Sequence, residues 1–314
     1  VRYQGRMGGI HKVKVLLPEF FKEQDLKSLP KGIEVVVYPK QGEVPRAGLE
    51  AEFLVASFPF GRTSALIEKL PNLKVIQTLT AGVDTILPFV PRGVTLCNAT
   101  GVHDVPMAEL MVSMLMALLK NLPEVRDNQT KQSWTWLDAD DLEGKTVLFL
   151  GYGSIAQAIE KRLEPFGAQF IRVARRERPG VYAISSLSAL LPLADAVILL
   201  LPLTEETTGI FGRELFSLLK LGALFINGGR GKLVDTEALV EVLQSQRIRA
   251  ALDVADPEPL PKGHPLWNAP GVLITPHIGG SSPGFARRAF ALVRQQLEGY
   301  VSGKPLLNVV ENGY

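Results

Sequence analysis

The sequence predicts an α/β protein built from two parallel sheets, and three observations lead to this fold class. Short apolar runs of strand length alternate with segments of helical periodicity from Val13 to Asn98. A second series of the same kind runs from Val147 to about Thr275. Between them lies a strongly amphipathic segment, residues 106–119. Because strands that alternate with helices form parallel sheets covered on both faces, we expect two such units.

The first series predicts a smaller α/β unit. Its helices are expected at 20–29 and 63–70, each ending before a proline, which cannot continue a helix. The expected strands are 13–17, 33–38, 53–57, 75–78 and 94–98.

The segment 106–119 predicts a helix with a proline in its first turn, and we take it as the first crossing between domains. Its methionines are expected to fill the core rather than bind a metal. The following stretch, 127–141, is polar and predicts a loop or arm. Trp134 and Trp136 interrupt it, either packing over the arm or meeting a second subunit, and packing is the preferred interpretation.

The second series predicts a doubly wound sheet of six strands. A long helix, 283–301, and an extended piece, 306–310, end the chain. We expect a substrate domain from residues 1–103 and 282–314, and a dinucleotide-binding domain from residues 104–281. The expected strands are 147–150, 169–173, 196–200, 223–227, 249–253 and 272–275, with helices at 154–164, 186–191, 213–220 and 235–245.

A glycine turn joins the first strand of the second series to its helix. Gly151 suits a tight turn, and Gly153 has no Cβ to obstruct a pyrophosphate. Ala156 takes the third small position of the dinucleotide fingerprint. The first helical amides, at Ser154 and Ile155, lack partners inside the helix and are expected to face the phosphates. The alternative is a plain connection between strand and helix.

The end of the second strand in this unit bears on the choice of nicotinamide cofactor. Ala174 stands where an acid for the ribose hydroxyls is expected, and Arg175 and Arg176 follow. An arginine pairs with a 2′-phosphate that an aspartate would repel. We therefore expect NADP rather than NAD. The alternative is that both arginines form a solvated turn and Glu177 holds the ribose.

Composition excludes several functional classes. The chain is 46% hydrophobic and 21% charged with a net charge of +2, which is ordinary for a globular protein and offers no surface for nucleic acid. We find no membrane-spanning segment, secretory signal or metal-ligand set. The single cysteine, Cys97, excludes an internal disulfide and suits a reducing compartment, so a cytoplasmic location is expected.

Three later segments each follow a predicted strand, where open α/β sheets bind their ligands. They are residues 225–235, 251–260 and 274–280. Arg230, set among glycines, is suited to fork onto a carboxylate. Taken singly, Arg230, Glu258 and His277 have ordinary structural explanations, but their occurrence after three neighbouring strands indicates a site.

These motifs resemble the D-isomer-specific 2-hydroxyacid dehydrogenases over nearly the whole chain. The resemblance rests on the glycine turn 151–156, residues 227–235, 253–267 and 275–279, and the loop 80–84. It implies a Rossmann cofactor domain inserted in a smaller flavodoxin-like domain, a cleft between the two, and a homodimer formed through the cofactor domain.

The resemblance also implies residue roles. His277 acts as general acid and base, and Glu258 favours its protonated form. Arg230 binds the carboxylate of a 2-oxo acid and polarises its carbonyl. The amides around Ala81 and Gly82 hold the other carboxylate oxygen. Asp253 anchors the nicotinamide amide, and further cofactor contacts fall to Leu201, Pro202, Thr207, Gly229 and Gly279.

The remaining histidines, His11, His103 and His264, are interpreted as loop residues. The sequence departs from the family pattern at Ala174, and at Gly228 and Gly229, where small residues suggest extra room.

The resemblance implies reduction of a small 2-oxo acid, such as glyoxylate or hydroxypyruvate, to the D-2-hydroxy acid. Two alternatives remain: oxidation of 3-phosphoglycerate, for which Arg62 is the obvious cation, and a non-catalytic nucleotide-sensing protein related to corepressors.

Overall fold

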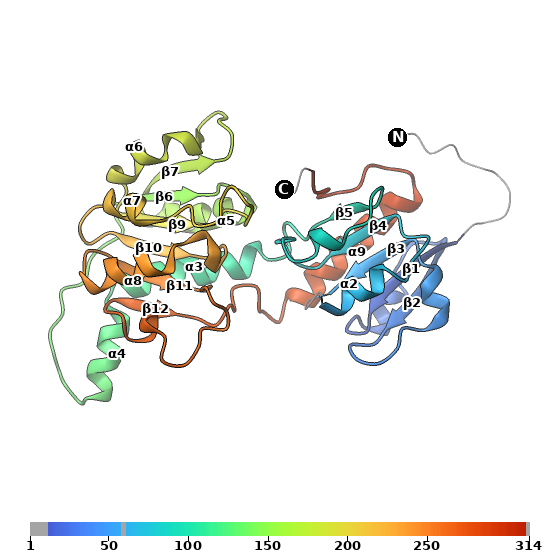
Figure 1. The fold of residues 1–314 in the computed structure, drawn as a ribbon, viewed down its shortest axis with the longest axis horizontal. Helices are drawn as coiled ribbons and strands as arrows, with labels where there is room; N and C mark the ends of the chain where they lie inside the picture. Colours follow the sequence, from blue (N-terminus) through green and yellow to red (C-terminus); the bar gives the residue numbers. More distant parts are fainter. Residues whose placement is uncertain (1–11, 58–60, 312–314) are drawn as a thin grey trace. The chain divides into compact units, whose positions relative to one another are not determined.

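The computed structural model describes residues 12–57 and 61–311, in two compact units (Figure 1). One unit takes in the chain up to His103 together with the segment from Ser282, and the other comprises Asp104–Ser281. Arg62, the candidate phosphate ligand, and His11 have no described side chain.

The first unit is a parallel sheet in the order β2-β1-β3-β4-β5. This is the flavodoxin-like order. The central strands β1, β3 and β4 are the most buried, as expected for a sheet covered on both faces. The strands are β1 (Val13–Pro18), β2 (Ile33–Tyr38), β3 (Phe53–Ala56), β4 (Val75–Thr78) and β5 (Thr95–Cys97).

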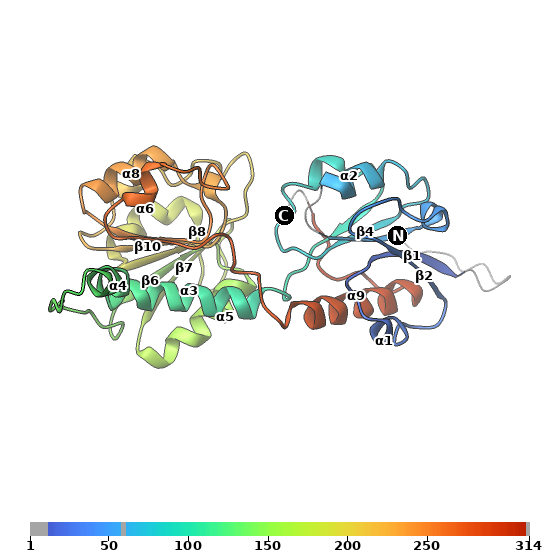
Figure 2. The same ribbon diagram turned by 90° about the horizontal axis from the view of Figure 1, so that it is seen from below.

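Helices cover both faces of this sheet. Figure 2 shows α1 (Glu23–Leu26) and α9 (Phe285–Val301) below it and α2 (Gly61–Ile67) above it. The helix predicted at 20–29 is a single turn, α1, and none of the four residues of α1 is buried. The C-terminal piece returns to the sheet, where Val309 forms a bridge to Cys97, which is buried and unpaired.

The second unit is a seven-stranded sheet in the order β12-β11-β10-β9-β6-β7-β8, in which neighbouring strands pair in parallel. The predicted sheet had six strands. The added strand, β8, has two residues and is too short to produce a period-2 pattern. The strands are β6 (Thr146–Leu150), β7 (Gln169–Ala174), β8 (Tyr182–Ala183), β9 (Ala196–Leu199), β10 (Leu224–Asn227), β11 (Arg249–Leu252) and β12 (Val272–Ile274).

Strand order reverses between β6 and β9, which creates the switch point at which doubly wound sheets bind dinucleotides. The fold class predicted from the sequence is therefore confirmed. Two cores lie on opposite faces of this sheet, with α3 and α5 on one face and α6, α7 and α8 on the other (Figure 2). The helices are α3 (Asp104–Leu119), α4 (Leu122–Thr130), α5 (Ser154–Leu163), α6 (Leu187–Leu190), α7 (Arg213–Ser217) and α8 (Thr236–Gln244).

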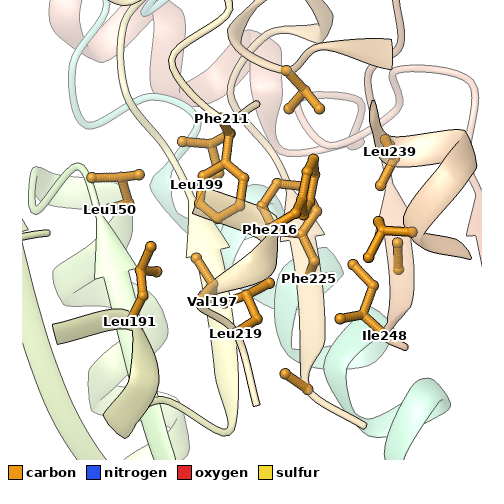
Figure 3. Packing of buried hydrophobic residues seen from close by; sticks show 14 of the residues in the cluster. Leu150, Leu191, Val197, Leu199, Phe211, Phe216, Leu219, Phe225, Leu239 and Ile248 are labelled. Atoms are coloured by element: carbon orange, nitrogen blue, oxygen red, sulfur yellow. The ribbon is translucent and has the colours of Figure 1, made fainter. Parts of the chain in front are cut away.

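An aromatic group stands at the centre of the larger core (Figure 3). The rings of Phe211, Phe216 and Phe225 lie 4.7–5.2 Å apart, in tilted and edge-on arrangements that favour aromatic pairs. Phe225 belongs to β10, so this packing fixes the strand that leads to Arg230.

The prediction of a loop or arm over residues 127–141 is partly wrong. Residues 127–130 belong to α4, a polar helix that starts with a proline in its first turn and buries none of its residues. Because such a helix shows little hydrophobic periodicity, its sequence looks like a loop. Residues 133–140 have no regular structure, and Trp134 and Trp136 are 103% and 87% exposed. The interpretation that these tryptophans pack over the arm of their own chain is therefore also wrong.

Among the described residues, no single helix is long and apolar enough to cross a bilayer. The helices α3 and α4 reach that length and apolar character only together, and they meet at a bend of 66°.

Candidate active site

The predicted residues of the second unit gather at one edge of its sheet, because each follows the carboxyl end of a parallel strand. Gly151 follows β6, Arg175 follows β7 and Leu201 comes after β9. Along the other half of the sheet, Gly229 and Arg230 follow β10, Asp253 follows β11 and His277 comes after β12. A parallel sheet brings these strand ends together, so the candidate site is assembled by topology.

The glycine turn after β6 requires its first glycine. Gly151 has a φ of +105°, and a Cβ there would lie 2.6 Å from the carbonyl carbon of Leu200. Among the described residues, apart from its chain neighbours, none has an atom within 4 Å of a Cβ built on Gly153, so this side of the turn is open for a phosphate. Ala156 is completely buried, which explains its small side chain.

The amino end of α5 fits an anion. The amides of Ser154 and Ile155 precede the first intrahelical hydrogen bond, from Gln157 to Gly153. The hydroxyl of Ser154 donates to Asp104 Oδ1 at 3.0 Å, so backbone amides rather than this side chain are left for a ligand. An open glycine and unpaired helix amides are the features that a dinucleotide pyrophosphate needs, and the residues present fit such a cofactor.

Cationic side chains cluster after β7. Arg175 and Arg176 are exposed, and Arg175 contacts Glu206 at 3.7 Å. The structure adds Arg178, which sequence reasoning missed: its Nη2 donates to the carbonyl of Tyr152, inside the glycine turn, at 2.6 Å. Only the Arg-rich composition of 175–178 hinted at Arg178, because the hairpin-like turn that returns it toward residue 152 cannot be seen in the sequence.

Tyr152 links the glycine turn to a charged pair. Arg172 forms a two-pronged contact with Glu160 at 2.7 Å and lies 5.6 Å from the centre of the Tyr152 ring. Burial, and then hydrogen bonding to Glu160, raises the pKa of Tyr152. Tyr152 is therefore a neutral support for the turn.

The loop after β9 is fixed by threonines. The hydroxyl of Thr207 donates to the carbonyl of Pro202 at 2.7 Å, and the amide of Thr204 donates to Thr207 Oγ1 at 2.8 Å. The carbonyl of Leu201 would lie 3.1 Å from a Cβ on Gly229. The loops after β9 and β10 therefore touch, and Gly229 permits the close approach.

Arg230 lies on a turn that is held from two sides. The side chain of Asn227 is buried. Its Oδ1 accepts a hydrogen bond from the backbone amide of Gly229 at 3.0 Å, and its Nδ2 donates one to the carbonyl of Arg230 at 3.0 Å. On the other side, a Cβ on Gly231 would lie 2.0 Å from the carbonyl oxygen of Ala255. Because Gly231 has no side chain, the Arg230 turn can pack directly against the loop that leads to Glu258.

The His277 turn is anchored by one carboxylate. Asp253 is 1% exposed, and its Oδ1 accepts from the Thr275 hydroxyl at 2.6 Å and from the Ile278 amide at 2.9 Å. Its Oδ2 accepts from the Gly279 amide at 2.9 Å. The turn includes His277 at a φ of +53°, an uncommon conformation for a residue with a side chain. Asp253 supplies three of the hydrogen bonds that hold it there.

His277 and Glu258 lie side by side. Nδ1 of His277 is 2.5 Å from Oε1 of Glu258, and both side chains are over 40% exposed. Because Glu258 occupies Nδ1, Nε2 is the ring nitrogen left to exchange a proton with a ligand. This is the arrangement of a general acid and the group that orients it.

The predicted carboxylate-binding loop belongs to the other unit. Thr78 Oγ1 donates to the carbonyl of Thr80 at 2.8 Å, and Thr80 Oγ1 donates to the carbonyl of Gly82 at 2.7 Å. The amides of Ala81 and Gly82 meet no acceptor in the described part of the chain. These two donors suit a carboxylate.

The extra room expected at Gly228 and Gly229 is not there. A Cβ on Gly228 would lie 2.5 Å from Sδ of Met111, and one on Gly229 would lie 2.8 Å from Leu233 Cδ1. Neighbouring side chains fill the space that the glycines leave. Of the other histidines, His103 contacts the carbonyl of Leu79 and stacks on Phe285, while His264 accepts from the Leu266 amide.

Comparisons with known proteins agree with this class of fold. The family model for the "D-isomer specific 2-hydroxyacid dehydrogenase, NAD binding domain" matches residues 112–279. The chain belongs to this family of oxidoreductases, whose members bind a nicotinamide cofactor.

Two curated relatives and one solved structure illustrate the similarity. The chain is 34% identical to the glyoxylate reductase/hydroxypyruvate reductase of Mus musculus over 79% of this chain and 82% of that protein. It is 32% identical to the D-3-phosphoglycerate dehydrogenase of Methanocaldococcus jannaschii over 95% of this chain, yet spans only 59% of that protein. A NADPH-dependent glyoxylate/hydroxypyruvate reductase from Sinorhizobium meliloti, solved with NADP and sulfate, superposes with a TM-score of 0.81 at 29% identity, over 96% of this chain and 100% of that one.

Proposed function

We propose that this protein reduces a small 2-oxo acid, such as glyoxylate or hydroxypyruvate, to the D-2-hydroxy acid with NADPH. The observation that carries the proposal is the 2.5 Å contact between His277 and Glu258, on a turn anchored by buried Asp253. We assign cofactor binding to the unit Asp104–Ser281 and substrate contacts to the other unit as well.

The proposed mechanism divides the work between two turns. Arg230 binds the carboxylate of the acid and draws electron density from its carbonyl oxygen. Nε2 of His277 gives that oxygen a proton, while Glu258 contacts Nδ1 at 2.5 Å and orients the ring. The nicotinamide cofactor, when bound, supplies the hydride. The amides of Ala81 and Gly82 are assigned to the remaining carboxylate oxygen.

Three cations support a preference for NADPH. Arg175 and Arg176 follow β7, and Arg178 reaches the carbonyl of Tyr152 in the glycine turn. Ala174 leaves no carboxylate where one would repel a 2′-phosphate. The relative from Sinorhizobium meliloti is named as NADPH-dependent, in line with this preference.

Steady-state turnover of a 2-oxo acid panel with NADPH and NADH tests the proposal. We expect glyoxylate or hydroxypyruvate with NADPH to give the highest kcat/KM. A clear advantage for NADH would overturn the cofactor preference. Absence of turnover with every acid would overturn the activity and favour the nucleotide-sensing alternative.

Oxidation of 3-phosphoglycerate is a second candidate, favoured by the match to a D-3-phosphoglycerate dehydrogenase over 95% of this chain. Adding 3-phosphoglycerate with NAD and NADP to the panel decides between them. A kcat/KM for 3-phosphoglycerate above those of the small acids would replace the first proposal.

We also propose a homodimer formed through the cofactor unit, in the cytoplasm. Trp134 and Trp136 lie exposed on the arm, and Leu122 and Val125 of α4 are also exposed. Exposed apolar side chains are found at many protein interfaces. Light scattering of the wild type should give a dimer mass, and replacing both tryptophans by alanine should give a monomer; a monomeric wild type would contradict this.

A further inference from the structure

We propose that Met107 is a positioning residue, whose side chain spaces the turn of Arg230 from the turn of His277. The inference rests on the proposed function, because it assumes that both side chains act on one substrate. Sequence reasoning assigned this methionine only to the core.

Met107 lies in the first turn of α3 and reaches two glycines. A Cβ built on Gly279 would lie 2.2 Å from its Sδ, and one built on Gly228 would lie 3.2 Å from its Cε. Met107 is 8% exposed, so the contact is buried. One thioether therefore touches the turn after β12 and the turn after β10.

These two turns belong to strands that are not neighbours. In the sheet, β11 lies between β10 and β12, so no backbone ladder joins the turns directly. Gly279 is tied on one side by the Asp253 carboxylate, and Gly228 is tied by its amide to the carbonyl of Leu199 at 3.1 Å. The side chain of Met107 contacts both turns from α3, and we infer that it sets the distance between them.

The choice of side chain fits this role. An unbranched thioether can lie against two glycines where a branched side chain would strike the backbone. Residue 279 must be glycine, because a Cβ there would lie 2.2 Å from Sδ of Met107 and 2.8 Å from Oδ2 of Asp253. A methionine that only filled the core would need neither an unbranched side chain nor a glycine opposite it.

A matched pair of variants separates positioning from packing. Met107→Ala is compared with Met114→Ala, a methionine of the same helix that is 2% exposed and belongs to the same core. We expect both to lower Tm by similar amounts. Met107→Ala should also reduce kcat/KM for the 2-oxo acid about tenfold to a hundredfold, since small displacements of catalytic groups have effects of this size, with KM for NADPH unchanged.

Two further variants keep the inference testable if the alanine variant folds poorly. Met107→Ile preserves volume but branches at Cβ, and it should also lose kcat/KM while remaining folded. Gly279→Ala alone should be severely impaired, because the added Cβ would lie 2.2 Å from Sδ of Met107 and 2.8 Å from Oδ2 of Asp253. Adding Met107→Ala should restore only the part of the activity that is lost through the overlap with sulfur.

The outcomes distinguish this inference from the proposed function. Wild-type kcat/KM in Met107→Ala or Met107→Ile, with only a lower Tm, would overturn the positioning role and leave the proposed function standing. A wild-type protein that turns over no 2-oxo acid would overturn both.

Discussion

Two regions at the same edge of the second unit's sheet are built in opposite ways. The turn of His277 is fixed from beneath by Asp253, which is 1% exposed and accepts three hydrogen bonds from that turn. The segment after β7 is open: Arg175 is 60% exposed at its side chain, and its ion pair with Glu206 is 3.7 Å long.

The difference follows from what each region is proposed to do. Proton transfer needs a ring nitrogen at one place, so buried hydrogen bonds that fix the turn are valuable. A phosphate is recognised by charge, which acts over longer distances and tolerates water and mobile side chains. Rigidity is therefore concentrated where a proton moves.

The largest expected effect comes from loosening the fixed region. Asp253→Asn replaces one carboxylate oxygen with an NH₂ group that faces amide donors of the turn, so His277 should lose its orientation. We expect kcat to fall by about 10²-fold or more. Asp256→Asn, at a partly exposed position nearby, is the control. Wild-type kcat in Asp253→Asn would show that the turn needs no such anchor.

A smaller and more selective effect is expected in the open region. Replacing Arg175 by alanine should raise KM for NADPH about tenfold, because a charged hydrogen bond contributes roughly 1.5–3 kcal/mol. KM for NADH and kcat should change little. Arg213→Ala, which removes a guanidinium paired with Glu241 on α8, is the control. Equal losses with both cofactors would contradict a role in choosing NADPH.

The smallest effect should appear at the opposite edge of the sheet. Asp195 precedes β9 and accepts from Lys220 at 2.7 Å and from the Thr146 amide at 2.8 Å. Burial alone would raise its pKa, but these hydrogen bonds and the Lys220 charge outweigh burial and lower it.

A lowered pKa means that the ionised carboxylate stabilises the fold above its unfolded value of about 3.9, and that this contribution is lost as pH falls through the folded pKa. Asp195→Asn should lower Tm by about 2–4 °C near neutral pH, as a loss of about 1 kcal/mol implies, and should leave kcat unchanged. The difference in Tm should shrink below about pH 4. A Tm difference that grows on acidification would contradict the assigned hydrogen bonds.

The sequence predicted the parallel sheets because buried strands and amphipathic helices carry strong periodic signals. It placed Gly151, Asp253 and His277 after the right strands, since topology puts strand ends together. It did not predict α4, whose exposed face lacks periodicity, or β8, which has two residues.

Long-range side-chain contacts were also beyond the sequence. The reach of Arg178 back to the glycine turn depends on a reversal of the chain at 178–181. The filling of the Gly228 space by Met111 depends on how α3 lies across the sheet. Neither contact leaves a local pattern in the residues involved.

The central claim is that the His277 ring, held by Glu258, transfers the proton to the carbonyl oxygen of the acid. It is tested most directly by kcat for glyoxylate reduction in His277→Ala, with NADPH binding measured on the same preparation. We expect kcat to fall by about 10²–10⁴-fold while NADPH binds as in the wild type. Turnover near the wild-type rate in a variant that still binds NADPH would contradict the claim.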